Sequence, residues 1–354
     1  MSYDALSERL SVAFDSEDDG GGSDESGIHV VSLPDGSVDY FYSLEDPQGK
    51  LLDTTAAFGR RLTDGETTFP LTPTDTRPGG QATNAAMQIH ELGERATLVG
   101  HLDHPVFDDL GFETYSMGTP ATINVLEFSD GDVLLPEPGP ADDWTIAALD
   151  AVVDWPDLIR ADAFCCVNWV SVRGLTDVFD RLASNPPSTD SFPIVVDPGE
   201  IGVHDEAAVA AFFRTLSETD AVDPLDIVCS VNPTEFDCVA AVLDIDDDRS
   251  HLDRLAAART ALGVHTIVVH GPEAARATTP DGVVSVDMLE TATTKRTTGA
   301  GDRFSGALAC ALARGWSTEL ALALANACAA HFVATAETAT PGALREFLAD
   351  RERQ

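Results

Sequence analysis

The chain has 354 residues, of which 60 are acidic and 21 basic, so that its formal net charge is −39. This length suits one large domain or two smaller ones, and the 44% of hydrophobic residues can fill a sizeable core. The negative charge argues against nucleic acid or anionic membranes as partners, because their phosphates would be repelled.

The acidic residues are spread along the whole chain instead of forming one tail. Salt screens their repulsion to about 3 Å at 1 M ionic strength, so the composition suggests a halophilic archaeon as the source. The six cysteines lie in apolar runs without a C-x-x-C motif, which is typical of buried thiols in a reducing cytosol. No signal peptide opens the chain and no apolar run approaches 18 residues, so we expect a cytoplasmic protein.

Residues 1–27 are predicted to be an acidic, flexible extension without a chemical role. Leu6 and Leu10 could form one face of a short helix, but residues 15–27 are rich in Asp, Gly and Ser, as linkers are. The folded domain is therefore placed at residues 28–354. It begins with a short apolar run, residues 28–31, which predicts a first buried strand.

Two glycines, Gly79 and Gly80, come directly before a predicted helix that begins at Gln81. Glycine lets a ligand come close to the backbone, and Asn84, one turn into the helix, can both donate to and accept from a hydroxyl group. This combination indicates a binding site for a polyol, although a purely structural turn would use the same glycine pair.

Between residues 136 and 290, short apolar runs alternate with helical patterns. The runs that predict strands are 163–167, 193–197, 226–231 and 264–270, and the helical patterns are 205–217, 234–243 and 249–262. Such alternation is typical of an α/β fold in which helices cover both faces of a mainly parallel sheet. Ligands of these folds bind at the carboxyl ends of the strands, where Asp197 precedes a Pro-Gly pair; a simple turn explains that pair equally well.

The most informative segment is residues 297–306, with the sequence TTGAGDRFSG. Gly299 and Gly301 stand where an apolar helical pattern begins, so the free N–H groups and the dipole of a helix N-terminus make an anion site there. Asp302 lies in the same first turn. A carboxylate in this place can accept a proton from a hydroxyl while the amides hold the phosphoryl group that the hydroxyl attacks, which is a layout for phosphoryl transfer to an alcohol.

Basic residues surround this motif in an otherwise acidic chain, namely Lys295, Arg296 and Arg303. A local basic island suits the binding of ATP. A dinucleotide fingerprint would need a third glycine where Phe304 stands, and a Walker loop would need Gly-Lys-Ser/Thr, which the sequence lacks. A plain helix cap explains the glycines but neither the aspartate nor the basic residues.

The segment Thr-Thr-Gly-Ala-Gly-Asp at residues 297–302 resembles the second signature of the ribokinase/PfkB-type carbohydrate kinases. The segment Gly-Gly-Gln-Ala-Thr-Asn-Ala-Ala at residues 79–86 is similar to their first signature, Gly-Gly-x-x-x-Asn-x-Ala. The resemblance covers residues 28–354. It implies a ribokinase-like three-layer α/β/α fold with a small β-sheet lid, whose strands we expect within residues 40–75 and 120–136.

The resemblance implies roles for two groups of residues. Those implied for catalysis are Asp302 as the base and the amides of Gly299, Ala300 and Gly301 as the anion hole. Those implied for sugar binding follow the first strand or open the glycine-rich helix, and they are Ser37, Asp39, Gly79, Gly80, Gln81 and Asn84.

ATP is implied as co-substrate and Mg²⁺ as cofactor. Glu235, at a helix start, would organise the water shell of Mg²⁺, and Asn232 would lie near the phosphates and the metal. A glutamate at a helix start also complements the helix dipole without any metal. Gly271 is expected to contact the nucleotide through its backbone, although Val269 stands where the family often has threonine, and Asn326 is expected near the adenine.

Two further residues need interpretation. Many members have Asp directly before Thr-Thr-Gly-Ala-Gly-Asp, where it helps to bind an activating monovalent cation, but this chain has Arg296. We expect Arg296 to supply fixed positive charge to the anion hole, and activation by K⁺ to be lost. His270 is expected to be a packed side chain or part of the pocket rim instead of an acid or base, because Asp302 already fills that role.

The predicted function is transfer of the γ-phosphate of ATP to a hydroxyl of a sugar or sugar-like substrate. Two alternatives stay open. One is a nucleoside or sugar-acid (2-keto-3-deoxygluconate-like) kinase of the same fold, for which Arg77 could meet a carboxylate. The other is a non-catalytic sugar-binding homologue. The resemblance also implies a homodimer formed through the lid.

Overall fold

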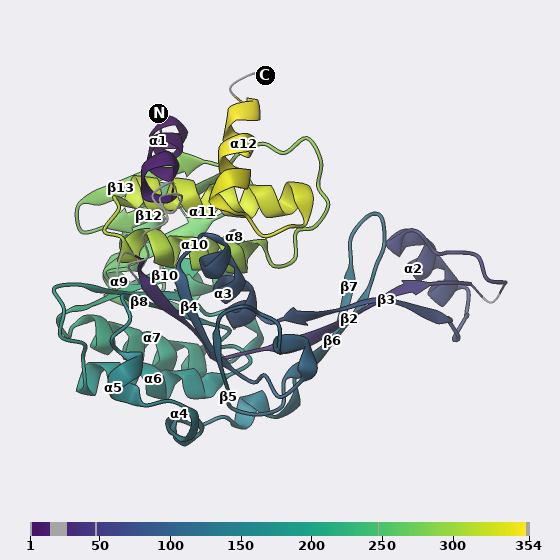
Figure 1. Cartoon of the computed structure of the whole chain (residues 1–354), viewed down its shortest axis with the longest axis horizontal. Coiled ribbons are helices and arrows are strands. Elements are labelled where there is room, and N and C mark those ends of the chain that lie inside the picture. Colours follow the sequence, from purple (N-terminus) through teal and green to yellow (C-terminus); the bar gives the residue numbers. More distant parts are fainter. Residues whose placement is uncertain (1, 15–26, 47, 247, 352–354) are drawn as a thin grey trace, which may run out of the picture.

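The computed structural model describes residues 2–14, 27–46, 48–246 and 248–351. Over these ranges the chain forms a large body, in which helices lie on both sides of a nine-stranded sheet, and a narrower sheet of four strands that extends away from it (Figure 1). The predicted three-layer α/β/α fold with a small β-sheet lid is thereby confirmed.

The large sheet is parallel from β11 to β5, and the hairpin β12–β13 is antiparallel. In spatial order its strands are β13 (Gly282–Asp287), β12 (Ala274–Thr279), β11 (Thr266–His270), β10 (Leu225–Val231), β9 (Phe192–Asp197), β8 (Ala163–Val167), β1 (His29–Leu33), β4 (Arg95–Gly100) and β5 (Glu113–Ser116). The five apolar runs that predicted strands correspond to β1, β8, β9, β10 and β11.

Both faces of the large sheet are buried, which explains why its strands are continuous apolar runs. In β8, Ala163, Cys165 and Val167 pack into the core on one face. Phe164 and Cys166 pack into the core on the other face. The cysteines are free thiols and five of the six are buried, as the sequence indicated.

Helices cover the two faces in separate groups. One face carries α1 (Ser2–Phe14), α3 (Gln81–Glu91), α10 (Ala300–Ala313), α11 (Thr318–Thr335) and α12 (Pro341–Arg351). The other face carries α4 (Ile146–Val152), α5 (Trp155–Leu158), α6 (Thr176–Ser184), α7 (Glu206–Asp220), α8 (Pro233–Val242) and α9 (His251–Leu262). Short 3-10 helices lie at η1 (Pro105–Phe107), η2 (Gly139–Asp143), η3 (Arg173–Leu175) and η4 (Ile201–Val203).

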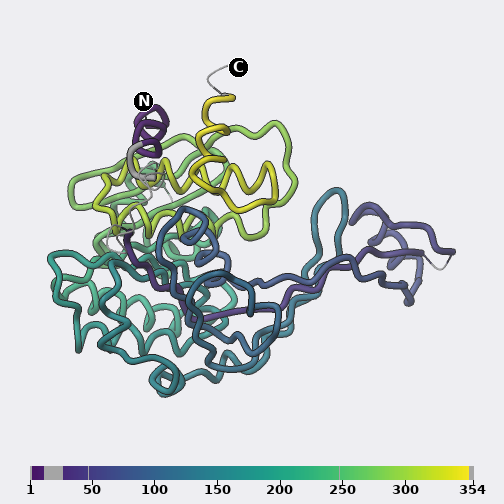
Figure 2. Tube along the Cα trace, in the orientation of Figure 1, coloured from purple at the N-terminus to yellow at the C-terminus, as the bar shows by residue number. Residues whose placement is uncertain are grey.

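The small sheet is the predicted lid. In spatial order its strands are β3 (Leu71–Gly79), β2 (Ser37–Leu44), β6 (Ala121–Leu126) and β7 (Val133–Glu137). β2 follows β1 after only three residues, so the chain runs directly from the body into the lid (Figure 2). Helix α2 (Thr55–Thr63), which the sequence analysis did not predict, packs at the far end of the lid, where Phe58 stacks on Phe128.

Three leucines on the outer strands β3 and β7 face solvent. Leu71 and Leu135 are each 50% exposed and Leu134 is 41% exposed. A lid-to-lid dimer would bury apolar side chains of this kind. The dimer stays a prediction, which light scattering on the purified protein would test.

The N-terminal segment differs from the prediction. Residues 2–14 form α1, whose Leu6 and Leu10 are fully buried in the same core as α11 and α12. These leucines are four residues apart and share one helix face, so their burial fixes the helix on the body. This part of the chain therefore belongs to the folded domain and is not a flexible extension, whereas residues 15–26 lie outside the described ranges.

Helix α11 is long and apolar enough to cross a membrane by length and composition alone. However, 67% of it is buried inside the protein, between the sheet and the neighbouring helices. An apolar helix in this position is the core helix of a three-layer fold.

Candidate active site

A cavity of about 440 Å³ lies where the lid joins the body. Its walls come from β2, β6 and β7 of the lid and from the first turns of α3 and α10. The predicted residues that line it are Ser37, Asp39, Gly80, Gln81, Asn84, Gly299 and Asp302. The two glycine-rich segments thus meet at one cavity, although they are far apart in the sequence.

At the wall of this cavity Asp302 contacts Asn84, which is 218 residues away in the sequence, and Asn84 Nδ2 donates to Asp302 Oδ2 over 2.8 Å. Asp302 reaches this place because Gly299, with a φ of 90°, takes the left-handed conformation that starts α10. Burial raises the pKa of the Asp302 carboxyl above its usual range, while the hydrogen bond from Asn84 and the charge of Arg303 lower it. The side chain is still partly exposed to the cavity, so its carboxylate can meet a hydroxyl group.

The amides at the start of α10 are only partly free. Ala300 N donates to Thr297 O over 3.1 Å, so this amide already takes part in a turn. Within the described ranges, the amides of Gly299, Gly301 and Asp302 meet no acceptor. An anion would therefore bind to these three amides, and the predicted contribution of Ala300 requires that its turn open.

Ser37 and Asp39, the sugar-binding residues that were predicted after the first strand, lie at the beginning of β2. Ser37 Oγ donates to Asp39 Oδ1 over 2.6 Å. Gly79 pairs with Ser37 across the sheet. A Cβ at Gly79 would lie only 2.3–2.4 Å from the atoms of the Asp39 carboxyl group, so glycine is what leaves room for that group. Gly80 has a φ of 99°, and a Cβ there would lie 2.8 Å from Gly36 Cα.

Two residues that the sequence analysis did not single out also line the cavity. Asp35 accepts from the backbone N–H groups of Gln81 (3.2 Å) and Ala82 (2.7 Å) and from Asn168 Nδ2 (2.6 Å). It thereby caps α3, whose own N-cap residue, Gly80, has no side chain. Asn168 follows β8 with a φ of 56°, a conformation in which asparagine is enriched. Both residues follow the carboxyl ends of strands, which is the signal that could have found them.

Several carboxyl groups crowd together beneath the cavity. Burial raises the pKa of Asp35 to about 6. Burial also raises the pKa of Asp197 well above its usual range, and the charges of Glu235 and Asp302 add to this effect. Asp197 accepts from Ser305 Oγ of α10 over 3.1 Å, so it belongs to the site and not to a surface turn. Negative charge that is crowded in this way suits a bound cation.

Asn232 and Glu235 form a capping box at the start of α8. Asn232 Oδ1 accepts from Glu235 N over 3.0 Å, and Glu235 Oε2 accepts from Asn232 N over 2.8 Å. Gly271 lies beside this box, because a Cβ there would be 3.0 Å from Pro233 Cγ. Within the described ranges no group of three His, Cys, Asp or Glu side chains is arranged to ligate a metal directly.

His270 is a packed side chain, as the sequence analysis expected. Its ring stacks on Phe304 with the centroids 4.5 Å apart. Burial lowers the pKa of His270 to about 4, so the ring is neutral at physiological pH. Its Cε1 lies 3.4 Å from the place that a Cβ on Gly301 would take. The ring therefore packs against the first turn of α10, and His270 is not among the residues that line the lid cavity.

Asn326 lies away from the cavity. Its side chain is fully buried in α11 and donates to Val286 O over 3.2 Å and to Tyr3 Oη over 3.3 Å. Tyr3 comes from α1, the helix that the prediction treated as a flexible extension. Because α1 covers this part of α11, the side chain has no surface that a nucleotide could reach. The predicted contact of Asn326 with adenine is therefore not seen, and the residue has a packing role.

Arg296 points toward the lid instead of the anion hole. Its guanidinium packs over Phe41 of β2, 4.8 Å from the ring centroid, and Arg77 packs on the same ring at 4.9 Å. It also lines the lid cavity, where its Nε is buried without a hydrogen-bond partner among the described residues. The positive charge that was predicted for the anion hole thus lies beside Phe41 of the lid, at the wall of the cavity.

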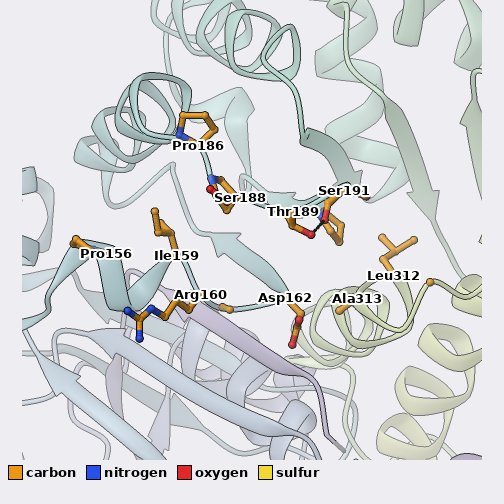
Figure 3. Close-up of a pocket in the computed structure, with 14 residues that line it drawn as sticks. Pro156, Ile159, Arg160, Asp162, Pro186, Ser188, Thr189, Ser191, Leu312 and Ala313 are labelled. Carbon is orange, nitrogen blue, oxygen red and sulfur yellow. Dashed lines mark hydrogen bonds between the residues drawn. The ribbon is translucent and has the colours of Figure 1, made fainter. Parts of the chain in front are cut away.

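A larger cavity, of about 590 Å³, lies at the opposite end of the sheet, near the amino ends of β8 and β9 (Figure 3). The residues that line it include Arg160, Asp162, Ser188, Thr189, Leu312 and Ala313. None of the predicted site residues reaches it, and the Arg160 side chain is 78% exposed. Size therefore does not decide between these two cavities, and we take the lid cavity as the candidate active site because seven of the predicted site residues line it.

Comparison with known proteins places this arrangement in a family. Residues 49–351 match the family model of the prokaryotic ketohexokinases. The curated proteins give no match. Among solved structures, the chain is similar to a ribokinase from Thermotoga maritima, with a TM-score of 0.66 and 18% identity over 91% of this chain and 99% of that chain.

Two further solved structures carry ligands. A ribokinase from Arabidopsis thaliana complexed with ribose and ATP is similar with a TM-score of 0.64 and 19% identity over 91% of this chain and 98% of that chain. A nucleoside kinase from Burkholderia thailandensis in complex with inosine is similar with a TM-score of 0.64 and 16% identity over 92% of this chain and 97% of that chain. At these identities the likeness establishes the fold.

The ribokinase fold and the family model together define a carbohydrate kinase. Because the family model covers most of its length, the chain belongs to the prokaryotic ketohexokinase family.

Proposed function

We propose that the protein transfers the γ-phosphate of ATP to a hydroxyl of a ketohexose, with Asp302 as the general base. The family supports a ketohexose as the acceptor. The observation that carries the mechanism is the position of Asp302, which starts α10, opens to the lid cavity and is held by Asn84 at 2.8 Å.

In this mechanism the acceptor lies in the lid cavity between Asp39 and Asn84. Its reacting hydroxyl donates to the Asp302 carboxylate, which takes the proton as the hydroxyl oxygen attacks the γ-phosphorus. The bond from the γ-phosphorus to the bridging oxygen breaks, and ADP leaves with that oxygen. The free amides of Gly299 and Gly301, with the dipole of α10, stabilise the charge that develops on the phosphoryl oxygens.

Mg²⁺, when bound, would neutralise part of the charge on the phosphates while it keeps most of its own water ligands. Glu235 and Asn232 fit such a cation, because the capping box uses only one oxygen of Glu235. Burial and the nearby charges of Glu200 and Asp302 raise the pKa of Glu235. This crowding of negative groups supports a cation site next to the start of α8.

The release of ADP from ATP, measured against a panel of acceptors, tests the proposal. The panel contains fructose and other ketohexoses, aldoses, ribose, inosine and 2-keto-3-deoxygluconate. Turnover that is fastest with a ketohexose supports the proposal. Turnover that is fastest with inosine or with the sugar acid would mean that the acceptor is a nucleoside or a sugar acid instead of a ketohexose. Sugar binding without ADP release from any member of the panel would mean a non-catalytic sugar-binding protein.

The absence of a carboxylate at position 296 predicts that K⁺ does not activate the enzyme. Arg296 cannot ligate a cation, and its guanidinium lies over Phe41 beside the lid cavity. Replacing KCl by tetramethylammonium chloride at equal ionic strength should therefore leave kcat unchanged. A large loss of rate that is specific to the removal of K⁺ would contradict the prediction.

The charge of −39 predicts that stability rises with salt. Repulsion between exposed carboxylates destabilises the compact state, and salt screens it. A series of thermal melting curves from low to multimolar KCl should therefore show a continuous rise in Tm. Equal Tm values at the two ends of the series would reject a halophilic adaptation.

A further inference from the structure

Arg303, the residue directly after Asp302, is buried beneath the loop that starts α10, and only 6% of it is exposed. Its Nη1 donates to Gly299 O over 2.9 Å, and its Nε donates to Thr338 Oγ1 over 3.2 Å. Its Cζ lies 3.7 Å from the centroid of the Phe332 ring. The guanidinium therefore ties the loop at Gly299 to the end of α11 and to the segment that follows this helix.

The contacts of this guanidinium within the described residues are two neutral oxygens and one aromatic ring. Taking an arginine out of water without a carboxylate partner is unfavourable. The chain has 60 acidic residues, so a counter-ion would be easy to supply. Burial lowers the pKa of Arg303 to about 10, which still leaves the group charged at physiological pH. Arg303 thus lies under the start of α10 without a hydrogen-bonded carboxylate among the described residues, and the Asp302 carboxyl is the nearby negative group with which its charge interacts.

We propose that Arg303 is a positioning residue for phosphoryl transfer, whose guanidinium holds the Gly299 carbonyl and thereby fixes the first turn of α10, where Asp302 lies. This inference rests on the proposed function.

The first part of this role concerns the backbone. Gly299 O accepts from Arg303 Nη1 over 2.9 Å and also from Arg303 N over 3.4 Å. These two donors hold the carbonyl oxygen toward α10, while the amides of Gly299 and Gly301 meet no acceptor within the described ranges. A carbonyl oxygen turned toward a phosphate would repel it, and fixed amides need no rearrangement when charge develops.

The second part concerns the proton. Several acidic groups lie close enough to Asp302 to interact with its charge, and they are Asp35, Asp39, Cys165, Asp197 and Glu235. They come from the β1–β2 segment, β8, β9 and α8. Arg303 is the charge that favours the ionised form of Asp302, and its loss would raise the pKa of the Asp302 carboxyl. A base with a raised pKa is protonated at higher pH, so the acid limb of kcat/KM would move upward in pH.

The test uses the full chain and three replacements of the same residue. Arg303→Met keeps most of the side-chain volume but removes the charge. Arg303→Lys keeps the charge but lacks the planar guanidinium with its several N–H donors. Arg303→Ala leaves space that added guanidinium can fill. Arg259→Met is the matched control, because Arg259 also donates from Nη1 to backbone carbonyls, those of Val264 and His265, at the far end of α9. For each variant, kcat, the KM values for ATP and ketohexose, the pH profile and Tm are measured.

We expect kcat of Arg303→Met to fall by about tenfold or more and its acid limb to shift to higher pH. This loss can be smaller than the roughly 100- to 1,000-fold that follows removal of a direct donor to the developing charge, because Arg303 acts through Gly299. Arg303→Lys should restore the position of the acid limb, and millimolar guanidinium should raise kcat of Arg303→Ala in a saturable way. Tetramethylammonium at the same concentration should not. Arg259→Met should match the wild type in all kinetic values.

Two outcomes overturn the proposal. One is an Arg303→Met variant whose kcat stays within about twofold of the wild type and whose acid limb does not move. The other is a loss of Tm that accompanies the loss of rate while neither lysine nor guanidinium restores any activity, because Arg303 would then have only a structural role. Failure of the proposed function is a separate result, since the wild type would then release no ADP with any sugar.

Discussion

Replacing Asp302 with asparagine should lower kcat by at least about 100-fold, which is the size expected when a general base is lost. The asparagine oxygen can still accept from Asn84 Nδ2, which lies 2.8 Å from Asp302 Oδ2, so the local hydrogen bond is kept. Because burial disfavours the charged carboxylate, the neutral amide should fold at least as well. The measurement is kcat at saturating ketohexose and ATP, together with Tm.

The role of Asp302 as base also predicts how kcat/KM depends on pH. The pKa of Asp302 is raised in the folded protein, and the base works only when it is ionised. Wild-type kcat/KM should therefore fall as the pH is lowered, from a pH above the ordinary aspartate range of about 3.9, and this limb should be absent from Asp302→Asn. Asp142→Asn, which changes an exposed partner of Arg173, is the control that should leave the profile as it is. Near-normal turnover of Asp302→Asn would remove this residue from the role of base.

Replacing Gly79 with alanine should weaken sugar binding with little effect on folding. The new Cβ would lie 2.3 Å from Asp39 Oδ1, so the carboxylate must rotate away from the cavity. A carboxylate side chain can move at low cost to the fold, but its hydrogen bonds to the acceptor would be lost. Hydrogen bonds to charged groups contribute about 1.5–3 kcal/mol, so the KM for the ketohexose should rise between about tenfold and 100-fold.

The matched control for this change is Gly59→Ala in α2 of the same lid. A Cβ at Gly59 meets nothing within 4 Å, so neither KM nor activity should change. The KM for ATP should stay constant in both variants, because the proposed mechanism assigns Asp39 to the sugar and not to the nucleotide. An unchanged KM for every sugar in Gly79→Ala would mean that Asp39 does not bind the acceptor.

The parts of the fold that the sequence predicted are those whose signal is local. β8 is an apolar run because both of its faces are buried, and its bounds match the predicted 163–167. The start of α10 was found because glycines, an aspartate and an apolar helix stand side by side in the chain. That Asn84 and Asp302 belong to one site was expected because the two local patterns resemble two signatures of one family, and in the structure their side chains are hydrogen-bonded.

The parts that the sequence did not reveal depend on contacts between distant residues. Asp35 caps α3, which begins more than 40 residues later in the chain, and it also accepts from Asn168, 133 residues away. Asn326 was placed at the nucleotide because α1 was not recognised as the helix that covers it. Arg296 turns toward the lid because Phe41 offers an aromatic face there. None of these partners leaves a pattern in the neighbouring sequence.

The short joint between β1 and β2 has a consequence for how the lid moves. The joint contains Asp35, which is fastened to the body, and it leads into Ser37 and Asp39, which travel with the lid. Any swing of the lid must then change the spacing between these carboxylates, so lid angle and sugar affinity are thermodynamically linked. If the proposed sugar binds beside this joint, a fluorescent label on α2, at the far end of the lid, should therefore respond to sugar binding.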